Sequence, residues 1–281
     1  MESLNLAFNS FSSIPYGFGN ISKLQYLNLS SSGFYGEIPR DISQLSKLVS
    51  LDLSSSYETL RMQTLHMPNM GDFVHNLTRL KELDLSYVSL LSPFPPILAN
   101  FSSLTLLGLE SCGLSGNFPV NIFQLPNLEV LSIGSNSNLS GSFPKMHWGS
   151  PLKSVYLYKT NFSGEIPTSI GNLSLLNELI VWGCYFSRSL PSSMGNLSHL
   201  TKLNLYRNNL QGQIPVSFAN LTQLSMLSLS SNNLQGQIPV SFANLTQLSV
   251  LYLSNNNLSG DSLEWVVNLT KLTDLDISAQ L

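Results

Sequence analysis

Charged residues are scarce in this sequence. Only 10% of its 281 residues are Asp, Glu, Lys or Arg, whereas about 25% is usual for a soluble domain. The formal net charge is -3, and proteins that bind nucleic acid need a concentrated basic surface. The composition therefore predicts no nucleic-acid partner.

Long apolar runs are also missing. No stretch approaches the roughly 18 apolar residues of a membrane span. The opening segment MESLNLAFNS has no basic region followed by an apolar one, which a signal peptide requires. The sequence predicts neither a transmembrane segment nor a signal peptide within these residues.

Signatures of catalysis are lacking as well. The four histidines are His66, His75, His147 and His199, and no carboxylate or cysteine joins them at a metal-ligand spacing. There is no G-x-S-x-G motif and no phosphate-binding glycine loop. We predict no catalytic residue, no metal site, no cofactor and no enzymatic activity.

What the sequence does contain is a repeat. Residues 210–225 read LQGQIPVSFANLTQLS and recur unchanged at 234–249, an offset of 24 residues. Taking the first Leu of LxxLxL as the opener of each unit, the openers are Leu24, Leu48, Leu80, Leu104, Leu128, Leu152, Leu176, Leu200, Leu224, Leu248 and Leu272. All steps are 24 residues except the 32-residue unit at 48–79. A fixed period of this length is typical of a solenoid.

Each part of the unit predicts a local structure. LxxLxL alternates apolar and polar residues, as a short strand with one buried face does. The G-x-I-P segment predicts an irregular stretch or a short edge strand, and VSFANLTQ a helical turn or two. Stacking of the units buries the leucine side chains that a single unit would leave exposed. We predict one repeat domain over 1–281: an α/β solenoid, horseshoe or superhelix, with a parallel sheet on its concave face and short 3-10 or helical turns on its convex side.

The residue eight positions after each opener is expected to be buried. Asn occupies it at Asn9, Asn136, Asn208, Asn232 and Asn256, where an amide can hydrogen-bond the main chain of two repeats. Other units carry Ser32, Ser56, Val88, Cys112, Thr160 and Cys184. The side chain of Val88 has no hydrogen-bonding group, so we expect that repeat to be locally weaker or irregular. The two cysteines lie three repeats apart, roughly 14 Å at about 4.8 Å per strand, too far for a disulfide.

The full unit, LxxLxLSxNxLxGxIPxxFxNLTx, resembles the plant-type leucine-rich repeat. Its G-x-I/F-P segments stand at 36–39, 116–119, 141–144, 164–167, 212–215 and 236–239. The order of units, including the long third one, looks like the ectodomain of plant leucine-rich-repeat receptor-like proteins. The resemblance covers essentially the whole chain.

This resemblance implies a plasma-membrane receptor with its repeats outside the cell. It implies a single-pass anchor, a partner or co-receptor kinase, and a role in defence or development. The family's signal peptide, end caps and anchor are missing here, so we expect a chain truncated at both ends. Two alternatives stay open: a secreted protein similar to polygalacturonase inhibitors, and an ectodomain piece of a receptor kinase. The sequence that follows residue 281 in the gene would distinguish them.

Twelve N-x-S/T sequons suggest an extracellular glycoprotein. Eight fall on one repeat position, so the motif also belongs to the repeat itself. The sequons are Asn20, Asn28, Asn76, Asn100, Asn138, Asn161, Asn172, Asn196, Asn220, Asn244, Asn257 and Asn268.

A ligand is expected on the concave face, at the positions two, four and six after each opener. The sixth position holds Tyr158, Trp182 and Tyr206 in three successive units. Aromatic residues and Arg dominate binding hot spots, although an aromatic row can also serve only to stabilise a sheet. The predicted site is Tyr156, Tyr158, Ile180, Trp182, Lys202, Tyr206, Arg207 and Tyr252, for a peptide, glycan or protein ligand.

Two further features are less specific. Asp52, Glu82, Asp84 and Glu110 make the earlier repeats acidic, which favours a basic partner or simply a solvated face. The excess residues of the 32-residue unit form either a loop that reaches a partner or a longer turn, and we favour the structural interpretation.

Overall fold

The computed structural model describes residues 1–55, 64–146, 148–259 and 263–280. It divides into two compact units, Met1–Ser140 (unit 1) and Gly141–Leu281 (unit 2). Each unit is a stack of leucine-rich repeats, and each is described by itself.

Every LxxLxL segment forms a three-residue strand that begins two residues after the opener. In unit 1 these are β1 (Ser3–Asn5), β2 (Tyr26–Asn28), β4 (Ser50–Asp52), β6 (Glu82–Asp84), β7 (Leu106–Gly108) and β9 (Val130–Ser132). In unit 2 they are β11 (Ser154–Tyr156), β13 (Glu178–Ile180), β15 (Lys202–Asn204), β17 (Met226–Ser228), β19 (Val250–Tyr252) and β21 (Asp274–Asp276). Within each unit the strands are parallel neighbours, and equivalent positions pair in register. The predicted strand positions are confirmed.

The alternation of LxxLxL decides which side of each strand is buried. Leu179, Leu203 and Leu227, at the centres of successive strands in unit 2, are completely buried. The residues on either side of them point the other way, because successive side chains on a strand face opposite sides. This leaves a row of accessible positions on every strand.

The residues that lead into the G-x-I-P segments, and their equivalents in other repeats, form a second set of short parallel strands. These are β3 (Gly36–Glu37), β5 (Leu65–His66), β8 (Ser115–Asn117) and β10 (Asn138–Gly141), then β12 (Asn161–Glu165), β14 (Tyr185–Ser189), β16 (Asn209–Gly212), β18 (Asn233–Gln237) and β20 (Asn257–Ser259). In β18 the strand ends at Gln237, two residues before Pro239. Proline therefore lies where its missing N–H costs no ladder bond.

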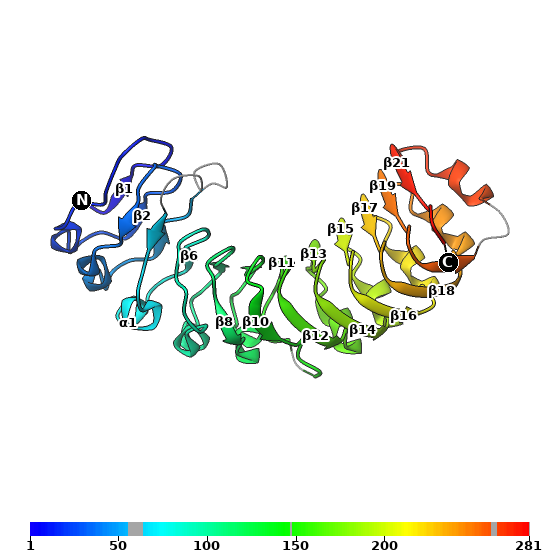
Figure 1. The fold of residues 1–281 in the computed structure, drawn as a ribbon, viewed down its shortest axis with the longest axis horizontal. Helices are drawn as coiled ribbons and strands as arrows, with labels where there is room; N and C mark the ends of the chain where they lie inside the picture. The colour runs from blue at the N-terminus through cyan, green and yellow to red at the C-terminus, as the bar shows by residue number, and fades with distance from the viewer. Residues whose placement is uncertain (56–63, 147, 260–262, 281) are drawn as a thin grey trace. The chain divides into compact units, whose positions relative to one another are not determined.

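A helical turn completes most repeats. Unit 1 has η1 (Phe18–Asn20), η2 (Arg40–Gln44), α1 (Met70–Val74), η4 (Pro96–Asn100) and η5 (Val120–Gln124). Unit 2 has η6 (Thr168–Asn172), η7 (Ser192–Asn196), η8 (Val216–Asn220), η9 (Val240–Asn244) and η10 (Glu264–Asn268). In unit 2 these turns lie on the side away from the strands β11 to β21 (Figure 1). The expected leucine-rich-repeat solenoid architecture is confirmed.

The residue eight positions after each opener links neighbouring repeats. Asn232 Nδ2 donates to Leu205 O of the preceding repeat at 3.0 Å and to Leu229 O of its own at 2.9 Å, and its Oδ1 accepts from Leu210 N at 3.1 Å. Asn208 and Asn256 make the same bonds in their own repeats. The expected role is confirmed for these three asparagines. Asn9 departs from it, because its side chain is exposed and its Nδ2 donates to Leu6 O at 2.9 Å within its own repeat.

The residues that replace Asn at this position differ in the hydrogen bonds that they make. Cys112 Sγ donates to Leu85 O at 3.1 Å, and Thr160 Oγ1 donates to Leu157 O at 2.7 Å. Val88 is completely buried, and the second strand set near it is reduced to single bridges, His66 with Ser89 and Pro93 with Ser115. The predicted irregularity of this repeat is confirmed. Ser56 lies outside the described residues.

Of the long repeat, the structure describes 48–55 and 64–79. After β5 the chain enters α1, where Asn69 Oδ1 accepts from Asp72 N at 3.1 Å. This Asn cap starts a short α-helix where most other repeats have a 3-10 turn. The part of the insert at 56–63 lies outside the described residues.

Candidate functional site

The accessible side of the strands β11, β13, β15, β17, β19 and β21 is here called the strand face of unit 2. It carries the positions two, four and six after each opener. All eight residues predicted to bind a ligand belong to this face or border it. Each of them is exposed or half-buried.

Three rings stand side by side on this face. The rings of Tyr158 and Trp182 are stacked, with centroids 5.3 Å apart and planes 5° from parallel. The ring of Tyr206 follows, with its centroid 6.4 Å from that of Trp182 and its plane tilted by 40°. We call these three residues the aromatic ladder. Their predicted adjacency is confirmed, while their role in binding stays a prediction.

The backbone beyond the strands keeps the ladder in register. Lys159 N donates to Trp182 O at 2.9 Å, and Gly183 N donates to Tyr206 O at 2.8 Å. The residue after each ring has a left-handed backbone, with φ of 52° at Lys159, 66° at Gly183 and 51° at Arg207. This turn recurs in every repeat of unit 2, so each ring leaves the backbone in the same direction as its neighbour.

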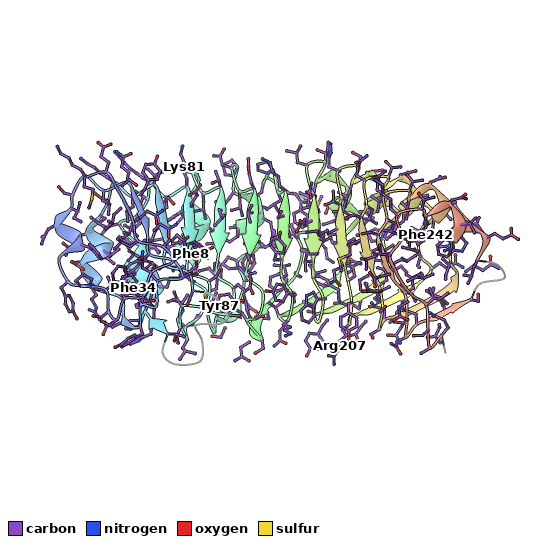
Figure 2. All side chains as sticks on the ribbon, turned by 90° about the horizontal axis from the view of Figure 1, so that it is seen from above. Phe8, Phe34, Lys81, Tyr87, Arg207 and Phe242 are labelled. Atoms are coloured by element: carbon purple, nitrogen blue, oxygen red, sulfur yellow. The ribbon has the colours of Figure 1, made fainter. Side chains whose placement is uncertain are left out.

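Two cations border the ladder. Lys159 Nζ lies 4.9 Å from the ring centroid of Trp182, within the range of a cation–π interaction. Arg207 is exposed and lies at the edge of the row of strands (Figure 2). The ladder therefore combines an apolar surface with positive charge on one side.

Glu178 connects two of the predicted residues. Tyr156 OH donates to Glu178 Oε2 at 2.7 Å, and Lys202 Nζ donates to Oε1 at 3.0 Å. Burial raises the pKa of Glu178, but the bonds from Tyr156 and Lys202 and the Lys202 charge outweigh it and lower that pKa overall. Burial, followed by the bond to Glu178, raises the pKa of Tyr156. Our sequence analysis missed Glu178, although its place between Tyr156 and Lys202 on adjacent strands was a usable signal.

The remaining predicted residues differ in their surroundings. Ile180 is half-buried on β13, in register with Tyr156 on β11. Tyr252 belongs to β19 and lies two strands beyond β15, so it stands apart from the aromatic ladder.

The acidic residues of unit 1 also share one side of its sheet. Asp52 and Asp84 are paired in register on β4 and β6. Burial, then the charges of Asp52 and Glu110, raise the pKa of Asp84, while hydrogen bonds with Ser86 oppose this. Gly108 leaves room for this carboxylate, because a Cβ there would lie 2.5 Å from Asp84 Oδ1.

The described part of the chain holds no group of three or more His, Cys, Asp or Glu side chains suited to a metal ion. His66, His75 and His199 are exposed, and His147 lies outside the described residues. Cys112 and Cys184 are free and buried, and burial raises the pKa of both thiols.

The sequons differ little in accessibility. Eleven of the twelve asparagines are exposed, and seven of these end a 3-10 turn, at Asn20, Asn100, Asn172, Asn196, Asn220, Asn244 and Asn268. Asn28 is the exception, since it is half-buried on β2 and its Oδ1 accepts from Ser30 N at 2.9 Å and Ser30 Oγ at 2.7 Å.

Among the residues that the structure describes, we find no helix with the length and hydrophobicity needed to cross a bilayer.

Known proteins resemble this chain in sequence. Models of the leucine-rich repeat family match residues 150–280, described as a leucine-rich repeat region, and residues 23–45, described as a leucine rich repeat. Receptor-like protein 6 of Arabidopsis thaliana is 41% identical over 186 residues, which cover 64% of this chain and 18% of that protein. The chain thus spans about a fifth of the length of this curated relative.

Solved structures extend the likeness to the whole chain. The crystal structure of a TDR receptor matches with a TM-score of 0.86 and 31% identity, covering 98% of this chain and 47% of that one. The ectodomain of the Arabidopsis receptor kinase HAESA, solved with an IDA peptide hormone ligand, matches with a TM-score of 0.83 and 31% identity, covering 99% and 50%.

Both matches show the same stacked-repeat fold as this chain. The expected resemblance to plant receptor-like proteins is confirmed by the sequence relative. The chain belongs to the leucine-rich-repeat family and is similar in sequence to plant receptor-like proteins.

Proposed function

We propose that this chain is part of the ligand-binding ectodomain of a plant cell-surface receptor-like protein. In this proposal the strand face of unit 2 binds a peptide ligand outside the plasma membrane. A separate partner kinase carries the signal, in defence or in development.

The stacked rings of Tyr158 and Trp182 are the observation that carries the proposal. Both rings are half-buried on the strand face, and Tyr206 and Arg207 extend the same surface. Exposed aromatic groups on a soluble surface mark contact sites more often than isolated apolar residues do. The alternative is a ladder that only stabilises the sheet, which predicts a loss of stability without a loss of binding.

A peptide suits this face better than a nucleic acid or a metal-bound ligand. The face offers rings, hydroxyls and separated charges along a row of parallel strands, which together match the mixed side chains of an extended peptide. The likeness to HAESA supports the same choice, because that ectodomain was solved with a peptide hormone.

The test uses peptides selected from a displayed random library against the full chain produced in a secretory plant host. Isothermal titration calorimetry then compares wild type with Trp182→Ala and Tyr206→Ala. We expect each substitution to weaken binding at least about tenfold, as hot-spot truncations do. Unchanged affinity in both variants, or a library that yields no binder, would refute the proposal.

Tyr185→Ala is the matched control. Tyr185 lies in the same repeat as Trp182 and is 55% exposed, but it belongs to β14 on the second set of strands. Its loss removes an exposed ring that borders Trp182 and Arg207 but changes no side chain of the strand face. We expect unchanged affinity, and thermal unfolding of all three variants shows whether the fold is preserved.

The extracellular location has its own test. Intact mass and peptide mapping of the secreted protein should show glycans at the exposed sequons that end 3-10 turns. Asn28 should carry none, because its side chain is engaged by Ser30 on β2. A protein without any added hexose would count against this location.

A further inference from the structure

A hollow opens in the strand face beyond the aromatic ladder. It has a volume of about 420 Å³ and lies between Tyr206 and Tyr252. The repeat between these two tyrosines contributes Ser228 and Ser230, each only 4% exposed. Neighbouring strands are about 4.8 Å apart, so two strand steps place the tyrosines at least roughly 10 Å apart. Tyr206 stands six residues after its opener and Tyr252 four residues after its own.

The floor of this hollow is small and already hydrogen-bonded. Ser254 Oγ lies 3.0 Å from Ser230 Oγ, so the two hydroxyls contact each other. Met226 and Asn204 complete the lining near Tyr206. The hollow therefore presents two aromatic walls above a floor without charge, and it admits a long, thin side chain.

One carboxylate stands at the far end. Asp276 lines the hollow and is paired in register with Tyr252 on the neighbouring strand. Its Oδ1 accepts from Ser278 N at 3.0 Å and from Ser278 Oγ at 2.7 Å. Hydrogen bonds from Ser254 and Ser278 lower the pKa of Asp276, so the group carries its negative charge at neutral pH.

No cation within the described residues forms an ion pair with Asp276. The ion pairs found there join Lys145 to Glu165 and Lys202 to Glu178. On the strand face, β17 and β19 carry no charged residue between Arg207 and Asp276. A ligand lying across these strands thus meets positive charge at the ladder and negative charge at the hollow.

We propose that the hollow between Tyr206 and Tyr252 binds a lysine or arginine side chain of the peptide ligand. The aliphatic part of that side chain lies between the tyrosine rings, which also favour a nearby cation. Its charged end meets Asp276. This assignment rests on the proposed function, since it names one residue class of the ligand that the strand face binds.

The same peptide library tests the assignment. Selection against the wild-type chain is compared with selection against Asp276→Asn and Asp276→Lys. Binders of the wild type should be enriched in Lys or Arg at one position. Their affinity should fall about tenfold with Asp276→Asn and further with Asp276→Lys, and the latter variant should itself select Asp or Glu at that position.

Asp274→Asn is the control. Asp274 begins the same strand, is exposed and does not line the hollow, yet its substitution removes the same charge. If Asp274→Asn and Asp276→Asn weaken binding equally, the effect is long-range attraction and the hollow is not the site. The isosteric Asp276→Asn keeps the test decisive if Asp276→Lys fails to fold.

The outcomes separate the two proposals. Binders that depend on Trp182 but not on Asp276, or that show no preference for Lys and Arg, overturn the cation site and leave the proposed function standing. Binders that are indifferent to Trp182 and Tyr206 overturn the proposed function. Selection of neutral glycans instead of peptides from a parallel glycan array would overturn both.

Discussion

The side-chain amide of Asn232 spans two repeats, because its Nδ2 donates to Leu205 O at 3.0 Å while its backbone belongs to the next repeat along the chain. Asn256 repeats the contact with Leu229 O at 3.0 Å. These bonds satisfy main-chain groups that are buried where each strand turns. One side chain per repeat thus adds to the main-chain bonds between strands that join neighbouring repeats.

Asn232→Ala should therefore destabilise the protein by about 1 to 3 kcal/mol, the cost of leaving buried polar groups without partners. Chemical denaturation followed by circular dichroism measures this change. The adjacent Asn233→Ala is the control, since Asn233 is exposed. Equal effects of the two substitutions would show that the buried hydrogen bonds of Asn232 contribute little.

Glu178 should make the stability of the folded protein depend on pH. Its pKa is lowered from its ordinary value of 4.5, so the folded state favours the ionised form. That contribution is complete above the ordinary pKa and is lost as pH falls through the lowered value. Glu178→Gln should cost about 0.2 to 1 kcal/mol at pH 7, as partly exposed ion pairs do, and less in acid.

Thermal unfolding of wild type and Glu178→Gln across pH 2 to 7, by roughly one-unit steps, measures this difference. Glu165→Gln serves as the control, because Glu165 is half exposed and lies 3.6 Å from Lys145 in a looser pair. A difference between Glu178→Gln and wild type that stays constant over the whole range would contradict the assignment.

Ionisation of Asp84 should lower the stability of the folded protein, in contrast to ionisation of Glu178. Burial raises its pKa, and the charges of Asp52 and Glu110 add to this. The ionised form is therefore disfavoured in the folded state, and stability declines as pH rises through the raised pKa. Asp84→Asn should raise the melting temperature at pH 7, and this gain should shrink as pH falls towards 3.8, the ordinary value.

Glu82→Gln provides the comparison for this prediction. Glu82 lies on the same strand and loses the same charge, but it is exposed. We expect a smaller change in melting temperature than for Asp84→Asn. A lower melting temperature for Asp84→Asn at pH 7 would show that its hydrogen bond with Ser86 outweighs the burial of its charge.

Much of the fold could be predicted from the repeat alone. The strands begin two residues after their openers, and Tyr158, Trp182 and Tyr206 are neighbours because each follows its opener by six residues. The hydrogen bond of Cys112 could also be predicted, because a thiol at the Asn position can donate one hydrogen bond to a carbonyl of the preceding repeat, here Leu85 O.

Other features of the structure could not be predicted from the repeat pattern. Gln280 takes the place of the buried Asn at the end of unit 2, where its Nε2 donates to Leu253 O at 3.1 Å and its Oε1 accepts from Leu258 N at 3.2 Å. Glu178 was missed because its importance depends on the two side chains that reach it. The hollow beside Tyr252 depends on small residues, which attract little attention in a sequence.

The sequence by itself determined the period, the strands and the identity of the residues that share each position, because a constant spacing along a covalent chain becomes a constant register once the units stack. The tertiary structure decided the tilt of Tyr206 against Trp182, the pairing of Glu178 with Tyr156 and Lys202, and the space left above Ser228 and Ser230. These features depend on how far each side chain extends and on which side chains it contacts. The spacing of residues along the sequence determines neither the extension nor the contacts.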